Sequence, residues 1–161
     1  MTIKAIGFNQ APALMAGQVD AVVVYANNEP IRLAAQGEKL SVINVGDSVS
    51  LAANGILTNE DTVANQPDLI RRFNRALLRG LQDTLANPDA AYTISKKYIE
   101  GITDDTVEKA VLAASIDMWK ADRLGRSEPA AWETMQQTLL DAGLLTQAQD
   151  LAKTFTNDFV P

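Results

Sequence analysis

The sequence contains no cysteine and no histidine among its 161 residues. Disulfides, thiolate chemistry and cysteine-ligated zinc are therefore excluded for this chain. Histidine is both the commonest general base and the commonest metal ligand, so its absence removes both. The acidic residues Asp104, Asp105 and Glu108 stand at a predicted helix start with no partner that suggests acid–base catalysis. We therefore expect no catalytic residue and no metal site.

Positive charge and long apolar runs are also scarce. The net charge is −6, so nucleic acid is not an expected partner. The longest apolar runs, such as DAVVVYA and AVLAAS, are far too short to cross a bilayer. The opening residues MTIK run directly into a strand-like segment and do not resemble a signal peptide. A cytosolic protein, a mature product and a fragment remain as alternatives.

The first half of the chain reads as short α/β units. Alternating or β-branched runs predict strands, and Pro and Gly mark short helices between them, at 13–17 and 30–36. The run at 21–25 is apolar throughout, which is typical of a buried parallel strand. The predicted strands are 3–8, 21–25, 40–45 and 50–58.

The second half shows helical spacing instead. Apolar residues recur every three or four positions after Pro67, and Asn87-Pro88 ends that helix. The predicted helices are 59–65, 67–85, 89–99, 103–122, 127–142 and 147–153. An α/β half joined to a helical run predicts part of a larger α/β protein. Three or four strands leave open sheet edges, which predicts further sequence, most simply upstream.

The stretch 18–37, QVDAVVVYANNEPIRLAAQG, carries the candidate site. Its predicted strand ends at Tyr25, Asn27, Asn28 and Glu29, and ligands of open α/β folds bind at the carboxyl ends of strands. A carboxylate, two amides and a phenol suit a neutral or weakly cationic flat heterocycle better than an anion. The alternative is a helix start, because Asn, an acid and Pro are all favoured there.

The stretches PALMAGQVDAVVVYANNEP, GILTNEDTVANQPDLIRRFNRALLRGL, NPDAAYTISKKY and FTNDFVP resemble the C-terminal part of ABC-importer substrate-binding proteins. The resemblance is to the thiamine-pyrimidine-precursor, riboflavin, sulfonate and nitrate superfamily. It implies a periplasmic-binding-protein type II-like fold, incomplete here. Residues 1–47 would be the second half of lobe two, 48–57 a hinge crossover with Asn54 and Gly55, and 58–161 the helical closing part of lobe one.

The resemblance also implies a function without catalysis or cofactor. The chain would capture a small flat heterocycle, a thiamine precursor or a riboflavin-like molecule, by lobe closure. Asn9 and Gln10 would join the site from the end of the first strand. Permease subunits would be the partners, and the protein would be periplasmic or extracellular, held at the membrane through the permease or a lipid anchor outside this chain.

Three other functions stay open. A sulfonate, taurine or nitrate ligand is the alternative within the superfamily. An enzyme like the fungal pyrimidine-precursor synthases is a second alternative, although those use histidine, cysteine and iron chemistry. A fragment that acts only as an oligomerising domain is the third, and domain swapping into a homodimer would satisfy its strand edges.

Overall fold

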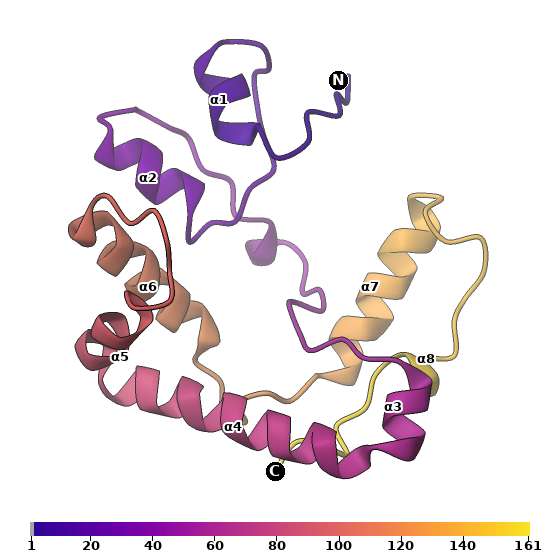
Figure 1. Cartoon of the computed structure of the whole chain (residues 1–161). Helices are drawn as coiled ribbons and strands as arrows, with labels where there is room; N and C mark the ends of the chain where they lie inside the picture. Colours follow the sequence, from indigo (N-terminus) through magenta and orange to yellow (C-terminus); the bar gives the residue numbers. More distant parts are fainter. Residues whose placement is uncertain (1) are drawn as a thin grey trace. The chain divides into compact units, whose positions relative to one another are not determined.

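The structure is a computed structural model that describes residues 2–161 (Figure 1). Helices account for all the regular structure in this range. The helices are α1 (Gln10–Met15), α2 (Glu29–Ala35), the 3₁₀ helix η1 (Val45–Asp47), α3 (Glu60–Asn65), α4 (Pro67–Ala86), α5 (Pro88–Ser95), α6 (Asp105–Trp119), α7 (Pro129–Asp141) and α8 (Leu151–Thr154).

The strand predictions are wrong for this structure, because no residue in 2–161 belongs to a strand. The segments 3–8, 21–25 and 50–58 lie outside helices and strands, and η1 begins where 40–45 ends. A strand exists only when a neighbour accepts and donates its backbone hydrogen bonds. Within the described range, no backbone hydrogen bond is recorded for 19–24 or 39–43. The α/β prediction therefore holds for the helices alone.

The helical predictions are confirmed, with ends shifted by a few residues. The local signals explain why these helices begin where they do. The Asn59 side chain accepts a hydrogen bond from the Thr62 amide at 2.8 Å, which caps α3. The Asp104 carboxylate accepts from the Thr106 amide at 2.8 Å, just ahead of α6. Gly37 follows α2 with a φ of 88°, a left-handed conformation that favours glycine.

The chain divides into two compact units. Unit 1 comprises Met1–Ile43 and Pro88–Met118, and unit 2 comprises Asn44–Asn87 and Trp119–Pro161. The buried apolar side chains of unit 1 are Ala13, Leu33, Tyr92 and Ile116, and those of unit 2 are Ile70 and Leu78. The lobe boundaries implied by the superfamily, at 47/48 and 57/58, stay a prediction.

In unit 1, α2, α5 and α6 lie side by side (Figure 1). The Tyr92 hydroxyl of α5 donates to Asp105 of α6 at 2.9 Å, and the Lys96 ammonium bonds the same carboxylate at 2.7 Å. Lys96 and Lys109 both lie over the Tyr92 ring, at 5.8 and 5.6 Å from its centroid. Shielding from water, then the Asp105 hydrogen bond, raises the pKa of Tyr92 to about 12. This cluster joins α5 to α6.

We expect this cluster to make the protein less stable at acid pH. The hydrogen bond from Lys96 and then that from Tyr92 lower the pKa of Asp105. A carboxyl group whose pKa is lowered on folding stabilises the protein above its unfolded pKa, about 3.9, and this contribution is lost as the pH falls through the folded pKa. The urea midpoint should therefore drop below about pH 4, and Asp105→Asn should flatten that drop.

Asp20→Asn is the matched control, because Asp20 is exposed and has no recorded partner among the described residues. Urea midpoints measured from about pH 2.5 to 6 would compare the two variants with the parent. An equal effect of both substitutions on the acid limb would contradict the assignment to Asp105.

In unit 2, aromatic packing holds the C-terminal segment. The Trp132 and Phe155 rings stack at 5.1 Å with an angle of 4° between their planes. The Asn74 side chain donates to the Phe159 carbonyl at 3.0 Å, and the Arg71 guanidinium lies over the Phe159 ring at 5.4 Å. These contacts give Trp132 a packing role in unit 2.

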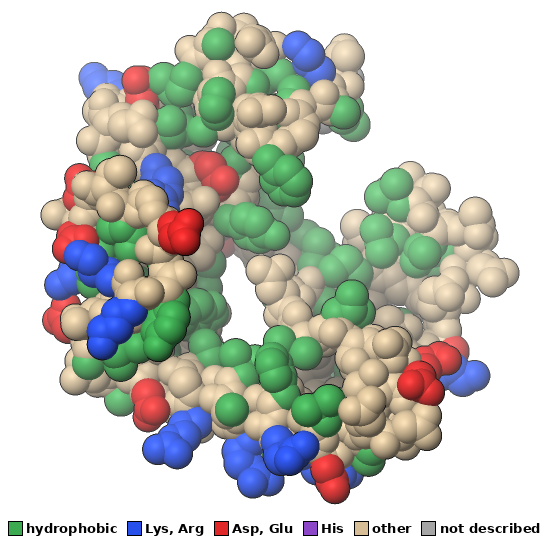
Figure 2. Space-filling model, in the orientation of Figure 1, with side chains coloured by type: hydrophobic (Ala, Val, Ile, Leu, Met, Phe, Trp, Pro, Cys, Tyr) green, Lys and Arg blue, Asp and Glu red, His purple; other side chains and the backbone are tan. Residues whose placement is uncertain are grey.

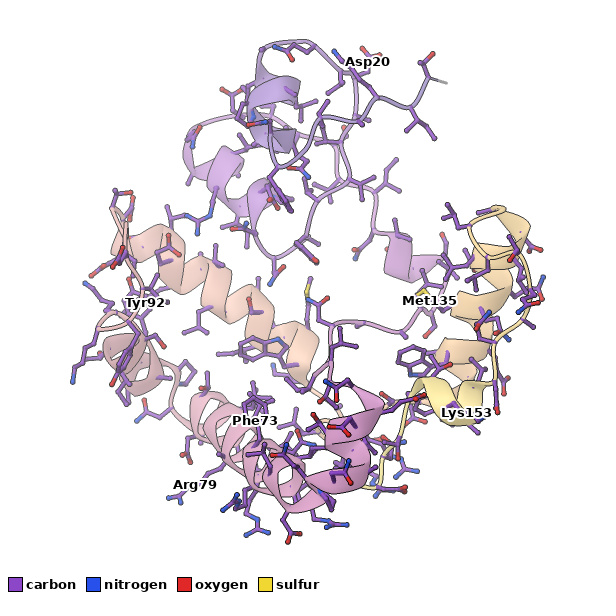
Figure 3. The ribbon with its side chains drawn as sticks, turned by 45° about the vertical axis from the view of Figure 1, so that its right-hand side comes forward. Asp20, Phe73, Arg79, Tyr92, Met135 and Lys153 are labelled. Carbon is purple, nitrogen blue, oxygen red and sulfur yellow. The ribbon has the colours of Figure 1, made fainter. Side chains whose placement is uncertain are left out.

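Helix α4 has two distinct sides. Ile70 and Leu78 are buried, as the apolar spacing predicts, whereas Phe73 is 52% exposed. Figure 3 shows Phe73 and Arg79 on opposite sides of the helix. The apolar face of α4 is thus only partly covered within unit 2. Among the described residues, no helix has the length and apolar character needed to cross a bilayer.

Candidate ligand-binding site

The segment 25–29 forms a turn that leads directly into α2. The Asn28 amide donates to the Tyr25 carbonyl at 3.0 Å, and the Asn28 carbonyl accepts from the Arg32 amide at 3.1 Å, which begins the helix. The Asn28 side chain makes no capping hydrogen bond. Its Oδ1 instead accepts from Arg32 Nε at 2.6 Å. Asn28 therefore occupies the cap position without performing the side-chain role of a cap.

Arg32 connects this segment to α6. Its two terminal nitrogens donate to the two carboxylate oxygens of Glu108, at 2.7 and 2.9 Å. Such bidentate, charge-assisted pairs fix geometry as well as adding energy. The Glu108 hydrogen bond is the largest contribution that raises the pKa of Arg32, and the charge of Glu29 adds to it. The guanidinium stays charged and holds the Asn28 amide in one orientation.

A second connection to α6 fixes Asn27. Its Nδ2 donates to Ser115 Oγ at 2.7 Å, and Ser115 Oγ donates in turn to the Val111 carbonyl at 2.8 Å. Ser115 is buried, so this polar group lies in the interior of unit 1 and needs its partners. Both neighbouring amides are thus anchored to α6, more than 70 positions away in sequence.

Sequence reasoning missed these two anchors and treated Glu108 only as a helix-start residue. The only signal was the spacing of seven between positions 108 and 115, which is about two helical turns and places both side chains on one face of α6. That spacing does not say which other segment the face contacts. The partner became visible only in the structure.

Glu29 supplies the least satisfied atom of the site. Its Oε2 is shielded from solvent and has no hydrogen-bond partner in the described part of the chain. An unpaired buried carboxylate oxygen costs free energy, and such an atom needs a specific explanation. The anchors leave Asn27 Oδ1 and Asn28 Nδ2 without a recorded protein partner as well. The segment therefore has two acceptors and one donor with no recorded partner among the described residues.

The structure gives less direct support for the other predicted site residues. The Tyr25 side chain is 64% exposed beside these groups, so its ring face is free to stack. Asn9 precedes α1, and its Nδ2 donates to the Ile6 carbonyl at 3.3 Å. Gln10 begins α1 and is half-buried. No recorded contact joins Asn9 or Gln10 to Glu29, so their part in the site stays a prediction.

The predicted hinge residues lie in unit 2. Asn54 and Gly55 are exposed and belong to no helix or strand. Their role as a hinge also stays a prediction. Within residues 2–161, no group of three or more carboxylates is arranged to hold a metal ion.

A basic groove of about 470 Å³ lies in unit 2. Arg75 and Arg79 of α4 line it together with Arg123, over an apolar floor that includes Leu78 and Leu124. Figure 2 shows Lys and Arg side chains gathered along α4. Guanidinium groups favour carboxylates, sulfonates and phosphates. The groove and the Glu29 segment therefore suit ligands of opposite charge.

Comparison with known proteins identifies the family. Residues 1–91 match the model of the family described as NMT1/THI5 like. The chain is 39% identical over 168 aligned positions to the riboflavin-binding protein RibY of Chloroflexus aurantiacus, a match that covers all of this chain and 48% of that protein. No solved structure matches the chain.

The chain belongs to the NMT1/THI5-like family, which confirms the superfamily of substrate-binding proteins expected from the sequence. It spans about half the length of the curated relative that it matches. The site residues Tyr25, Asn27, Asn28 and Glu29 all fall within the part of the chain that the family model covers.

Proposed function

We propose that this chain is part of a solute-binding protein that captures a flat heterocycle of the riboflavin or aminopyrimidine kind. The observation that carries the proposal is the shielded, unpaired Oε2 of Glu29. A ring N–H or an exocyclic amino group would donate to this oxygen and remove the cost of leaving it unpaired. The riboflavin-binding relative supports the same ligand class.

The rest of the segment fits such a ring. Asn28 Nδ2 would donate to a ring carbonyl or ring nitrogen, and Asn27 Oδ1 would accept from a hydroxyl or amino group. The Tyr25 ring would stack on the flat face of the ligand. Because α6 holds both amides in place, little side-chain ordering remains to be done on binding. The function needs no bond breaking and no cofactor.

The wider function belongs to the same proposal. Lobe closure about the 48–57 crossover would enclose the ligand, and the closed form would be presented to ABC permease subunits. The protein would work in the periplasm or at the outer surface of the membrane. The riboflavin-binding relative supports this assignment over the synthase alternative.

Native mass spectrometry with three ligands tests the proposal. We expect a mass shift with riboflavin or with a hydroxymethyl-aminopyrimidine and none with taurine, because taurine has no flat ring to stack on Tyr25 and Glu29 would repel its sulfonate group. Unfolding temperatures with and without each ligand provide the second measurement, since a ligand that binds the folded state raises the transition. Binding of taurine but neither heterocycle would contradict the proposal.

The basic groove favours a second candidate, an anionic solute such as a sulfonate or nitrate. Arg75 and Arg123 have no recorded carboxylate partner within the described residues. If taurine binds in the same experiment, Arg75→Gln should abolish that binding. Arg71→Gln is the control, because Arg71 is already paired with Asp68 at 3.0 Å.

A further inference from the structure

We propose that the basic groove of unit 2 binds a small molecule that carries a phosphate monoester group on an apolar or aromatic body. The groove has a volume of about 470 Å³, and sites for small molecules have roughly 300–1,000 Å³. This inference narrows the second candidate function, on which it rests, from small anions to larger ones with an apolar part. It is independent of the heterocycle site, because the residues of that site belong to unit 1.

Three guanidinium groups give the groove its charge. Arg75 and Arg79 lie one turn apart on α4, and Arg123 comes from the segment between α6 and α7. No ion pair is recorded for Arg75 or Arg123 in residues 2–161, and Arg79 Nε is 3.9 Å from Asp83, the longest of the recorded ion pairs. No aspartate or glutamate is among the described residues that line the groove. The positive charge there is therefore largely uncompensated.

A phosphate monoester matches this charge better than a smaller anion does. It carries a charge of about −1.5 to −2 at pH 7, and its three free oxygens accept hydrogen bonds. A guanidinium group donates two parallel hydrogen bonds to phosphate oxygens, so several such groups share one phosphate. Nitrate carries a single charge, and taurine adds an ammonium group that the guanidinium groups would repel. Neither of these smaller ions would cover the apolar floor.

The floor of the groove selects for the rest of the ligand. Leu78, Leu124 and Val160 contribute to it, each from a different part of the chain. Leu78 is buried, whereas Leu124 and Val160 are only half-buried. An aromatic or hydrocarbon body would remove this apolar surface from water, which a bare phosphate ion would not do. The floor therefore favours a phosphate ester over inorganic phosphate.

Contacts within unit 2 hold the walls of the groove in place. The segment that carries Arg123 is fixed at Ser127, whose amide donates to Asn157 Oδ1 and whose carbonyl accepts from Asn157 Nδ2, both at 2.9 Å. The hydrogen bond from Asn74 to the Phe159 carbonyl ties the C-terminal segment to α4. Walls that are already ordered reduce the cost of binding. The groove is thus formed before any ligand arrives.

Calorimetric titration of the chain with phenyl phosphate tests the inference. Inorganic phosphate, nitrate, taurine and phosphatidylcholine vesicles that contain phosphatidic acid are titrated in parallel. We expect phenyl phosphate to bind about tenfold more tightly than inorganic phosphate, because its ring covers the floor of the groove. Amide NMR shifts on binding should fall at 75–82, 123–124 and 160 and not at 25–29. Riboflavin should leave these shifts unchanged, which keeps this result separate from the heterocycle titration.

Substitutions at the rim and on the floor separate the two parts of the site. Arg123→Gln should weaken the binding of both phosphate and phenyl phosphate by about tenfold, through the loss of a charge-assisted hydrogen bond. Leu124→Ala should weaken the binding of phenyl phosphate alone, and Val160→Ala repeats this test at a second floor residue. Arg126→Gln is the matched control, because Arg126 is exposed on the same segment and lies outside the groove lining. Urea midpoints show whether each variant is folded.

The outcomes distinguish this inference from the function on which it rests. Nitrate or taurine binding as tightly as phenyl phosphate would overturn the inference and keep the second candidate function. Binding of vesicles but not of phenyl phosphate would assign the groove to a lipid surface, and an equal loss in Arg123→Gln and Arg126→Gln would reduce the binding to overall charge. Either result would also overturn the inference. No binding of any anion would overturn both proposals for the groove.

Discussion

Glu29→Gln should weaken binding of the flat heterocycle by roughly 10- to 100-fold. A hydrogen bond to a charged group contributes about 1.5–3 kcal/mol, and each 1.4 kcal/mol is a factor of ten in affinity. The substitution keeps the size of the side chain and removes the charge that the shielded Oε2 carries. Quenching of riboflavin fluorescence, read as a titration, gives the two dissociation constants.

The stability of the same variant separates the two interpretations of this segment. If Glu29 is a ligand-binding group, its substitution removes both the cost of the unpartnered Oε2 and the attraction to Arg32, so the free energy of unfolding should change little while binding weakens. If Glu29 only complements the dipole at the start of α2, its loss lowers that free energy by about 0.3–1 kcal/mol and leaves binding unaffected. The two roles are therefore distinguished by whether the substitution weakens binding or lowers stability.

Glu38→Gln is the matched control for this experiment. Glu38 follows α2 and Gly37, is exposed, and undergoes the same change of charge. We expect its dissociation constant to stay within a factor of about two of the parent, because its distance from the site leaves only a screened effect of charge. Equal losses of binding in both variants would mean that the overall charge, and not the Glu29 oxygen, governs affinity.

The helices of this protein could be read from the sequence because their causes are local. Pro67 opens α4, Asn59 caps α3 and Gly37 ends α2, and each of these signals acts within a few residues. The strand predictions were wrong because the causes of a strand are not local. The run at 21–25 has the composition of a buried strand, but a strand needs a neighbour to pair with, and no strand is present among residues 2–161.

The candidate site was likewise predictable only where its causes are local. Asn27, Asn28 and Glu29 could be selected because their side-chain chemistry and their position after an apolar run are visible in the sequence. What holds them could not, because the Arg32–Glu108 and Asn27–Ser115 hydrogen bonds join residues 76 and 88 positions apart. The unpaired state of Glu29 Oε2 is also a property of the packed structure alone.

Gly125→Ala should lower the free energy of unfolding by about 1–3 kcal/mol, through two causes. Gly125 has a φ of 81°, a left-handed conformation that costs other residues about 1–2 kcal/mol. A Cβ at this position would also lie 2.5 Å from Cδ2 of Leu78. Leu78 is only 8% exposed, so its side chain has little room to move away. Urea denaturation measures the loss.

Gly80→Ala is the matched control and should have the opposite sign. Gly80 lies within α4, a Cβ there would meet nothing within 4 Å, and alanine is favoured over glycine in a helix by about 0.8–1.0 kcal/mol. The two causes at Gly125 can be separated with Leu78→Ala, which removes the clash and leaves the backbone conformation. If the clash matters, the double variant will lose less stability than the two single variants together. If the effects are strictly additive, the whole effect of Gly125→Ala comes from the backbone. If Gly125→Ala leaves the stability unchanged, the packing of this loop against α4 is contradicted.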